Sequence, residues 1–120
     1  MISKLTRSFN YAFRGLKFAY LHDQSFRMEV WVTPLVFLFG YTLWPLTMAE
    51  LLFLALGVTL IYITELINTS FERALDRLHP EQHELIGKSK DIASAAVFVA
   101  IIFTFIVVLT ITLSRFGVLY

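Results

Sequence analysis

The sequence contains no cysteine, which excludes disulfide bonds, thiolate catalysis and cysteine-ligated zinc or iron-sulfur centres. Ten Lys and Arg residues are nearly balanced by nine Asp and Glu residues, and the net charge of +1 shows no basic excess that would indicate a nucleic-acid-binding protein. Low-complexity stretches and internal repeats are also missing. Residues 1–29 interleave charged and apolar positions, so we expect no cleavable signal peptide.

Apolar side chains dominate what is present. They make up 58% of the 120 residues, and twelve of them are Phe. This fraction exceeds the one typical of soluble domains, which is about 45 to 50%. We therefore expect a small all-α integral membrane protein that forms a single membrane domain over residues 1–120.

The spacing of apolar residues predicts one interfacial helix and three transmembrane helices. Residues 4–20 place apolar and basic side chains on different sides of a helix, as expected for a helix that lies at the lipid headgroups. Three apolar runs, 30–46, 51–71 and 92–113, are predicted to cross the membrane. The second run continues as a helix to about residue 78, since a proline follows at position 80.

The distribution of basic residues predicts the orientation. Polar connections are expected at residues 21–29, 47–50 and 79–91, and every Lys and Arg except Arg115 lies before residue 30 or between residues 73 and 90. Positive residues are retained on the cytoplasmic side. We therefore expect a cytoplasmic N-terminus and a cytoplasmic third connection, with the C-terminus outside.

A polar stripe begins inside the second apolar run. Glu65, Asn68, Glu72 and Asp76 are three, four and four residues apart, so they share one face of a helix. Glu65 lies about 21 Å along a helix that starts at Leu51 and crosses a core of about 30 Å. Because a charge within the membrane costs about 2.5 to 3.5 kcal/mol on insertion scales, we expect Glu65 to have a function.

Other segments supply further charges near the same face. The carboxylates are those of Asp23, Glu29 and Asp91, and the cations nearby are Lys88 and Lys90. Mg²⁺ prefers oxygen ligands and shares its remaining positions with phosphate oxygens, so the pattern favours a site for a metal and a polyphosphate. The alternative is a set of ion pairs at the helix ends. The residues to which it applies most are Arg73, Arg77, Glu81 and Glu84.

Two common motifs are incomplete. Residues 87–89 spell the last letters of a P-loop, but Gln82 stands where the first glycine belongs and no strand precedes it. His79 and His83 lack a third histidine or cysteine ligand for zinc.

Three stretches together carry a family resemblance. The run ELINTSFERALDRLHPEQHELIGKSKDIASAAV at residues 65–97, with FNYAFRGL at 9–16 and FRME at 26–29, resembles the small prokaryotic diacylglycerol kinases. The resemblance implies a homotrimer in the bacterial inner membrane that transfers the γ-phosphate of ATP to a lipid hydroxyl with Mg²⁺. Its active sites would form between subunits at the cytoplasmic interface.

The resemblance also implies roles for individual residues. Glu65 matches the general base, with Asn68 beside it and Lys90 neutralising the developing charge; Asp23 and Glu72 match metal ligands. Asp23 stands where the family usually has Glu, so this ligand is one methylene shorter. The implied nucleotide contacts are Lys4, Tyr11, Asp23, Glu72, Glu81, Gln82, His83, Lys90 and Asp91. The implied lipid contacts are Glu29, Glu65 and Ser94.

Several alternatives remain open at this stage. FNYAFRGL is typical of undecaprenol kinases, whereas ALDRL, HELIGKSKD and ASAAV are typical of diacylglycerol kinases, so diacylglycerol is the favoured lipid and undecaprenol the alternative. A different class of function is a non-enzymatic membrane oligomer or pore lined by Glu65 and Asn68. In a third interpretation, Glu65 has a structural role and sets the register between helices. Against a pore, the stripe continues beyond the membrane and ends beside lysines.

Overall fold

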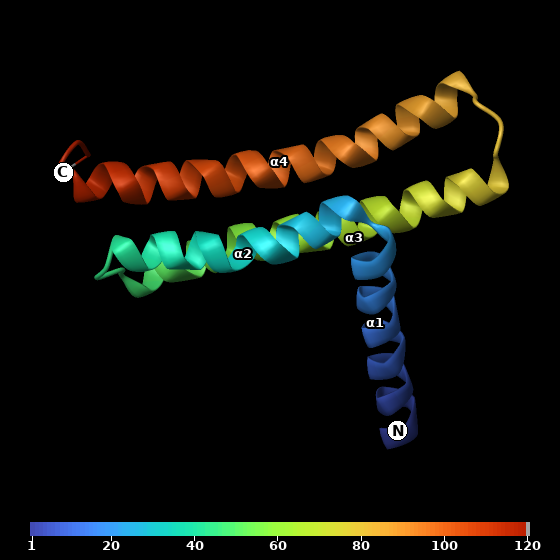
Figure 1. Ribbon diagram of the computed structural model, residues 1–120, viewed down its shortest axis with the longest axis horizontal. Helices are drawn as coiled ribbons and strands as arrows, with labels where there is room; N and C mark the ends of the chain where they lie inside the picture. The colour runs from blue at the N-terminus through green and yellow to red at the C-terminus, as the bar shows by residue number, and fades with distance from the viewer. Residues whose placement is uncertain (120) are drawn as a thin grey trace.

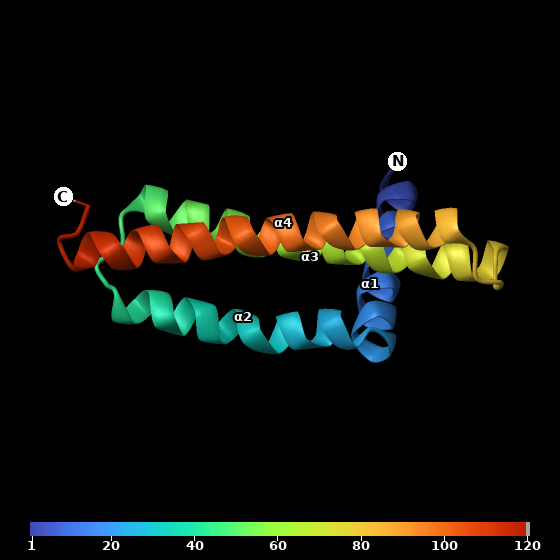
Figure 2. The same cartoon turned by 90° about the horizontal axis from the view of Figure 1, so that it is seen from above.

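The computed structural model describes residues 1–119 and contains four helices. These are α1 (Ile2–His22), α2 (Gln24–Thr42), α3 (Met48–Leu78) and α4 (Glu84–Arg115). Figures 1 and 2 show α2, α3 and α4 running along the long axis, while α1 projects from them nearly at a right angle. The predicted all-α class is confirmed.

Two helices, α3 and α4, are long and apolar enough to cross a membrane. The shorter α2 does not reach the same hydropathy, because it starts with a polar turn that includes Arg27 and Glu29. Its uncharged part, residues 30–42, spans about 20 Å at 1.5 Å per residue. A complete crossing by α2, and with it the three-span arrangement, stays a prediction.

Two of the three connections, the first and the third, are shorter than the sequence predicts. Residues 21–29 are helical except for Asp23, whose backbone N–H donates to the Ala19 carbonyl at 2.8 Å and whose carboxylate accepts from the Ser25 N–H at 3.0 Å. One residue thus ends α1 and begins α2. The change of direction between them needs no longer hinge, because Asp is among the best N-cap residues.

Capping contacts also give the other two connections different bounds from those predicted. The second one covers residues 43–47 and not 47–50, because the Thr47 hydroxyl accepts from the Glu50 N–H at 3.1 Å and the Glu50 carboxylate accepts from the Thr47 N–H at 2.9 Å. The third covers residues 79–83 and not 79–91, since the His83 ring accepts from the Leu85 N–H at 3.1 Å and starts α4 there.

The closest approach of two helices is between α3 and α4. A Cβ atom added to Gly57 would lie 2.6 Å from the Thr104 hydroxyl oxygen and 3.2 Å from the Thr104 Cα atom. Leu54 and Val58 on α3 and Ala100 on α4 are buried around this contact. Small residues let membrane helices approach each other and pack by van der Waals contact, so Gly57 sets the distance between α3 and α4.

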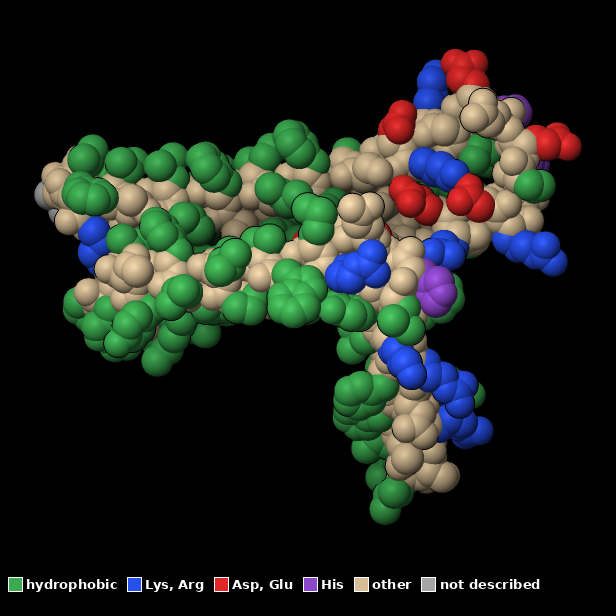
Figure 3. Space-filling model, in the orientation of Figure 1, with side chains coloured by type: hydrophobic (Ala, Val, Ile, Leu, Met, Phe, Trp, Pro, Cys, Tyr) green, Lys and Arg blue, Asp and Glu red, His purple; other side chains and the backbone are tan. Residues whose placement is uncertain are grey.

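Large apolar side chains cover the outer surface. Figure 3 shows them over α2 and α4, whereas charged side chains gather near the α3–α4 connection. Trp31 is 68% exposed and Phe105 is 65% exposed. So much exposed apolar surface suits lipid or further copies of the chain. On α1 the basic and apolar side chains occupy different sides, which supports its predicted place at the membrane surface.

Arg115 fastens the end of the bundle that lies opposite the charged end. Its guanidinium donates to the carbonyls of Leu43 at 2.9 Å and Pro45 at 2.7 Å, and it forms a two-point ion pair with Glu50, with a shorter N–O distance of 2.6 Å. One side chain at the end of α4 therefore holds the α2–α3 connection and the first turn of α3.

Gly57→Ala is expected to lower the free energy of unfolding by about 1 to 3 kcal/mol, because the added methyl would force α3 away from α4. Gly15→Ala on α1 is the matched control, since nothing lies within 4 Å of its added methyl. The control should be neutral or stabilising by up to about 1 kcal/mol through helix propensity. Thermal unfolding in detergent checks this, and equal stability losses for both variants would contradict the packing argument.

Arg115→Ala is expected to lower the free energy of unfolding by about 1 to 3 kcal/mol, because two carbonyls and Glu50 lose their donor. The hydrogen bond from Arg115 holds the pKa of Glu50 below its ordinary value of 4.5. Ionised Glu50 therefore stabilises the fold at neutral pH, and this contribution should disappear as the pH falls below that value. When unfolding is followed from about pH 7 downwards, the free energy of unfolding of Glu50→Gln should fall less than that of the unmodified protein.

Candidate functional site

The polar stripe of α3 passes from the interior of the bundle to its charged end. Glu65 is 5% exposed and Asn68 is 8% exposed, whereas Glu72 is half-buried and Asp76 is exposed. Burial thus decreases steadily along the stripe. A buried carboxylate and amide one turn apart require hydrogen-bond partners.

Asp23 reaches the stripe from the junction of α1 and α2. The Thr69 hydroxyl donates to one oxygen of its carboxylate, while the other oxygen caps α2. On the stripe itself, the Asn68 amide donates to the Glu72 carboxylate at 3.4 Å. The two predicted metal ligands, Asp23 and Glu72, are therefore each oriented by a neighbouring side chain of α3.

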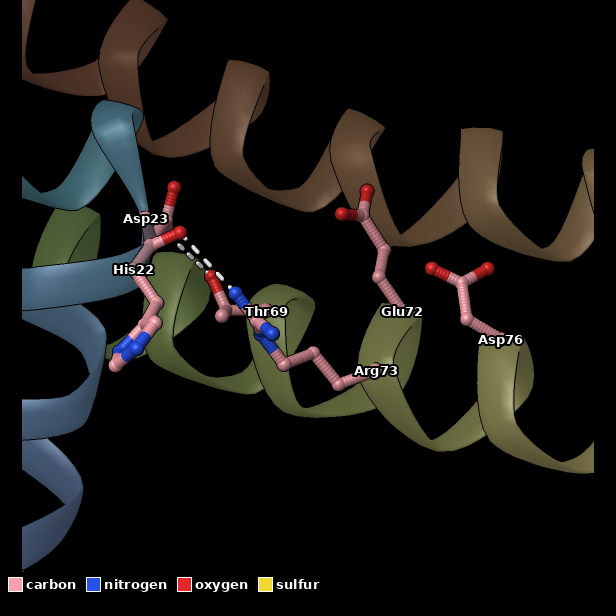
Figure 4. Close-up of a pocket in the computed structure, with 6 residues that line it drawn as sticks. All are labelled: His22, Asp23, Thr69, Glu72, Arg73 and Asp76. Atoms are coloured by element: carbon pink, nitrogen blue, oxygen red, sulfur yellow. Dashed lines mark hydrogen bonds between the residues drawn. The ribbon is translucent and has the colours of Figure 1, made fainter.

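A polar cavity of about 430 Å³ contains both of these carboxylates. Figure 4 shows its six lining residues, which come from the α1–α2 junction and from α3. They are His22, Asp23, Thr69, Glu72, Arg73 and Asp76. Three carboxylates and one guanidinium give this polar cavity an excess of negative charge, which favours a cation within it.

An apolar cavity of about 410 Å³ lies between α2, α3 and α4. Valine, isoleucine and methionine side chains form most of its wall. Its polar lining residues are Ser25, Glu29, Thr33, Tyr62, Glu65 and Thr104. An apolar pocket with a few convergent polar groups is the usual form of a site for a small or amphipathic ligand.

Glu65 lines the apolar cavity and lies about two helical turns from Glu72 of the polar cavity. Two buried oxygen atoms nearby, Oε2 of Glu29 and Oδ1 of Asn68, have no hydrogen-bond donor among residues 1–119. A ligand that brings donors or positive charge would satisfy this group of acceptors.

The donor set fits a hard divalent cation that is shared with a second ligand. No group of three His, Asp or Glu residues in the described chain is arranged as a complete metal site. Mg²⁺ is commonly held by only one or two carboxylates, together with waters and substrate phosphates. Asp23 and Glu72 in the polar cavity meet that requirement.

Lys90 and the α3–α4 connection lie at the outer edge of the site. Lys90 forms an ion pair with Asp76, which also lines the polar cavity. A third cavity, of about 570 Å³, contains Asp76, Lys90 and the predicted nucleotide contacts Glu81, Gln82 and His83. Asp76 therefore links this loop cavity to the polar cavity.

Four predicted site residues are not brought to these cavities within a single chain. Lys4 and Tyr11 are exposed on the projecting α1, and Asp91 and Ser94 are exposed on α4. None of the four lines the polar, apolar or loop cavity. The Tyr11 ring instead packs under the guanidinium of Arg14, at 5.5 Å.

The sequence analysis missed three hydroxyl residues. Thr69 holds Asp23, and the hydroxyls of Thr33 and Tyr62 hydrogen-bond to each other in the apolar cavity. The available signal was the presence of these hydroxyl residues inside the apolar runs 30–46 and 51–71, since each hydroxyl needs a partner there.

The ion-pair interpretation of Arg73 is wrong, while an ion pair does occur at Glu84. Arg73 donates to the His22 carbonyl at 3.1 Å and lies over the Phe18 ring at 4.8 Å. It thereby fixes the end of α1 to α3. Glu84 pairs with Lys88 at 3.1 Å on the exposed surface of α4, where such pairs contribute little stability.

The known proteins that are similar to this chain belong to one family. The family model described as prokaryotic diacylglycerol kinase matches residues 10–112. The diacylglycerol kinase of Haemophilus influenzae is 35% identical over 104 residues, which cover 83% of this chain and 84% of that protein. The diacylglycerol kinase of Escherichia coli K12 is 31% identical over 115 residues, or 96% of this chain and 93% of that protein.

Asp23→Asn is expected to leave the fold intact and to weaken divalent-cation binding. Asn caps a helix about as well as Asp, so the free energy of unfolding should change by less than about 0.5 kcal/mol. Removing one charge from the polar cavity should lower the affinity for Mn²⁺ by about tenfold or more. Electron paramagnetic resonance of bound Mn²⁺ measures this, with Glu50→Gln at the opposite end of the bundle as the control. Unchanged affinity in Asp23→Asn would place the cation elsewhere.

Proposed function

Since the chain belongs to the prokaryotic diacylglycerol kinase family, we propose that it is an ATP-dependent diacylglycerol kinase whose reaction takes place at Glu65. The observation that carries this assignment is one buried carboxylate that lines the apolar cavity and shares a helical stripe with a carboxylate of the polar cavity. A lipid alcohol and a nucleotide can reach that carboxylate from opposite sides. The product is phosphatidic acid.

Glu65 acts as the general base. A lipid hydroxyl is a weak nucleophile near neutral pH, and a positioned base that takes its proton makes attack possible. The hydroxyl oxygen attacks the γ-phosphorus as its proton passes to the Glu65 carboxylate. The bond from the γ-phosphorus to the bridging oxygen breaks, and ADP leaves. Positioning and electrostatics supply most of the rate enhancement, as in other phosphoryl transfers.

Asp23 and Glu72 would hold the Mg²⁺ that accompanies ATP. When bound, this ion would neutralise negative charge on the phosphates. Asn68 keeps the Glu72 carboxylate oriented, and Thr69 does the same for Asp23. Both carboxylates lie toward the charged end of α3, which is where the phosphates of a nucleotide must arrive if the lipid hydroxyl is at Glu65.

Lys90 and the loop cavity bind the nucleotide. Lys90 already forms an ion pair with Asp76 beside the polar cavity, so its ammonium needs only a small movement to contact a phosphate. Glu81, Gln82 and His83 surround the adjoining space, which suits the rest of the nucleotide. The negative polar cavity alone would repel a polyphosphate, which is why Lys90 and the cation are both required.

We further propose that the enzyme is a homotrimer whose subunits share each site. Lys4 and Tyr11 on α1 and Asp91 and Ser94 on α4 are exposed and outside the cavities of their own chain. The exposed apolar surface of α2 and α4 gives neighbouring subunits a place to pack. Assembly would let one subunit complete the nucleotide and lipid contacts of another.

The site faces the cytoplasm of a bacterial inner membrane in this proposal, because ATP is supplied there. The basic side of α1 then meets the headgroups, and the Arg115 end of the bundle lies outside. Burial of Glu65 within a single chain argues against a pore between copies, since a pore-lining carboxylate would remain exposed to the channel. Undecaprenol presents a similar hydroxyl to Glu65, so the base does not separate the two candidate lipids.

Glu65→Gln is expected to lower kcat by about 10² to 10⁴, because the amide cannot accept the proton of the lipid hydroxyl. The kcat is measured with purified protein in mixed micelles, with labelled ATP and either diacylglycerol or undecaprenol. Glu50→Gln, the same change at the opposite end of the bundle, is the matched control and should keep full activity in the folded protein.

Size measurement in detergent accompanies that assay. Wild-type turnover by Glu65→Gln in an unchanged oligomer would remove the base assignment. Wild-type turnover together with an altered oligomer would make Glu65 a residue that sets helix register. Phosphorylation of neither lipid by the unmodified protein would remove the kinase proposal itself.

A further inference from the structure

The apolar cavity contains a pair of hydroxyl groups that the proposed reaction does not use. Thr33 on α2 and Tyr62 on α3 both line this cavity, and their hydroxyls hydrogen-bond to each other. The Glu29 carbonyl oxygen lies 2.7 Å from the Thr33 hydroxyl oxygen and 3.2 Å from the Tyr62 hydroxyl oxygen, so two hydroxyl hydrogens are shared among three contacts. The general base Glu65 lines the same cavity one helical turn after Tyr62.

The Tyr62 ring is held in place from the side. Phe26 of α2 is only 4% exposed and packs edge-on against it, with 5.7 Å between the ring centroids. Such edge-to-face pairs are a favoured aromatic geometry and stabilise one ring orientation. The phenolic oxygen therefore has a fixed position in the cavity, and only its hydrogen can rotate.

The count of donors and acceptors leaves the Tyr62 hydrogen free to change partner. The Glu29 carbonyl lies inside α2, where the backbone N–H four residues later is its helical donor. The Thr33 hydroxyl can therefore donate to the Tyr62 oxygen while the Tyr62 hydrogen turns to a ligand, and no buried group is left unpaired. The exchange therefore avoids the usual cost of about 1 to 3 kcal/mol for an unsatisfied buried polar group.

The chemistry of the two candidate lipids differs at the corresponding position. Diacylglycerol carries an ester carbonyl a few bonds from its free hydroxyl, whereas a polyprenol carries only hydrocarbon there. Residues three apart on a helix have Cβ atoms about 5 to 6 Å apart, so Tyr62 and Glu65 can contact neighbouring groups of one small headgroup.

We propose that the Tyr62 hydroxyl, positioned by Thr33, donates a hydrogen bond to an ester carbonyl of diacylglycerol and so selects a glyceride over a polyprenol. This inference rests on the proposed kinase function and names a specificity contact within it. The hydroxyl of the lipid lies at Glu65 and the ester at Tyr62. The acyl chains extend over the apolar wall of the cavity and the exposed apolar surface beyond it.

The test compares two lipids that differ only in the carbonyl. A 1,2-diacylglycerol and the matching 1,2-dialkylglycerol ether, which lacks carbonyl oxygens, are assayed with unmodified protein and with Tyr62→Phe. Loss of one hydrogen bond should lower kcat/KM of Tyr62→Phe for the diacylglycerol by about tenfold. For the ether lipid and for a polyprenol the expected change is less than about twofold.

Two further variants complete the design. Tyr41→Phe on α2 is the matched control, since Tyr41 is 69% exposed and lies outside the apolar cavity. It should leave kcat/KM unchanged for every lipid. Thr33→Val removes the hydroxyl that positions Tyr62 and should reproduce part of the loss, again only for the diacylglycerol.

The outcomes separate this inference from the proposed function. Equal losses on the ester and ether lipids in Tyr62→Phe would overturn the specificity contact, because a purely structural role affects both lipids alike. The unmodified protein should prefer the ester lipid by about tenfold, and equal use of the two lipids would overturn the contact even if Tyr62→Phe fails to fold. Failure of the unmodified protein to phosphorylate any of the lipids would instead overturn the kinase proposal.

Discussion

A carboxylate enclosed by apolar helices determines how the rest of the molecule is arranged. Glu65 is 5% exposed, and its charged neighbours are Asp23 and Glu72, not a lysine or an arginine. Burying a charge without a partner is costly, and these neighbours add repulsion. In the proposed reaction, a cation and a substrate proton would relieve this cost. The proposed function therefore uses a position that lowers the stability of the bundle.

Asp23 connects the architecture to that site. The same carboxylate caps α2 and accepts from Thr69 of α3, so the bend between α1 and α2 also sets the position of the proposed metal ligand. This double use would account for the shorter side chain at a position where the family resemblance implies Glu. Asp is a strong N-cap and Glu is not among the preferred cap residues, so a longer carboxylate would give up the cap.

The two ends of the bundle are built differently. Arg115 ties the α2–α3 connection to the end of α4, and Gly57 brings α3 and α4 into close contact in the middle. Toward the charged end, cavities separate the helices and the surrounding side chains are polar. A bundle fixed at one end leaves room at the other for a nucleotide and for neighbouring subunits. Function should accordingly depend on helix packing as much as on the residues of the α3 stripe.

The sequence by itself determined the all-α class, the face of α3 that carries the stripe and Glu65 as its first residue, because helical spacing and hydropathy are local properties. Only the tertiary structure decided that Tyr62 meets Thr33, that Arg73 binds a carbonyl of α1, and where the connections begin and end. The two contacts join residues tens of positions apart, and they depend on the distance and rotation between packed helices. No periodicity within one segment encodes that geometry, since it arises from residues such as Gly57 that act between helices.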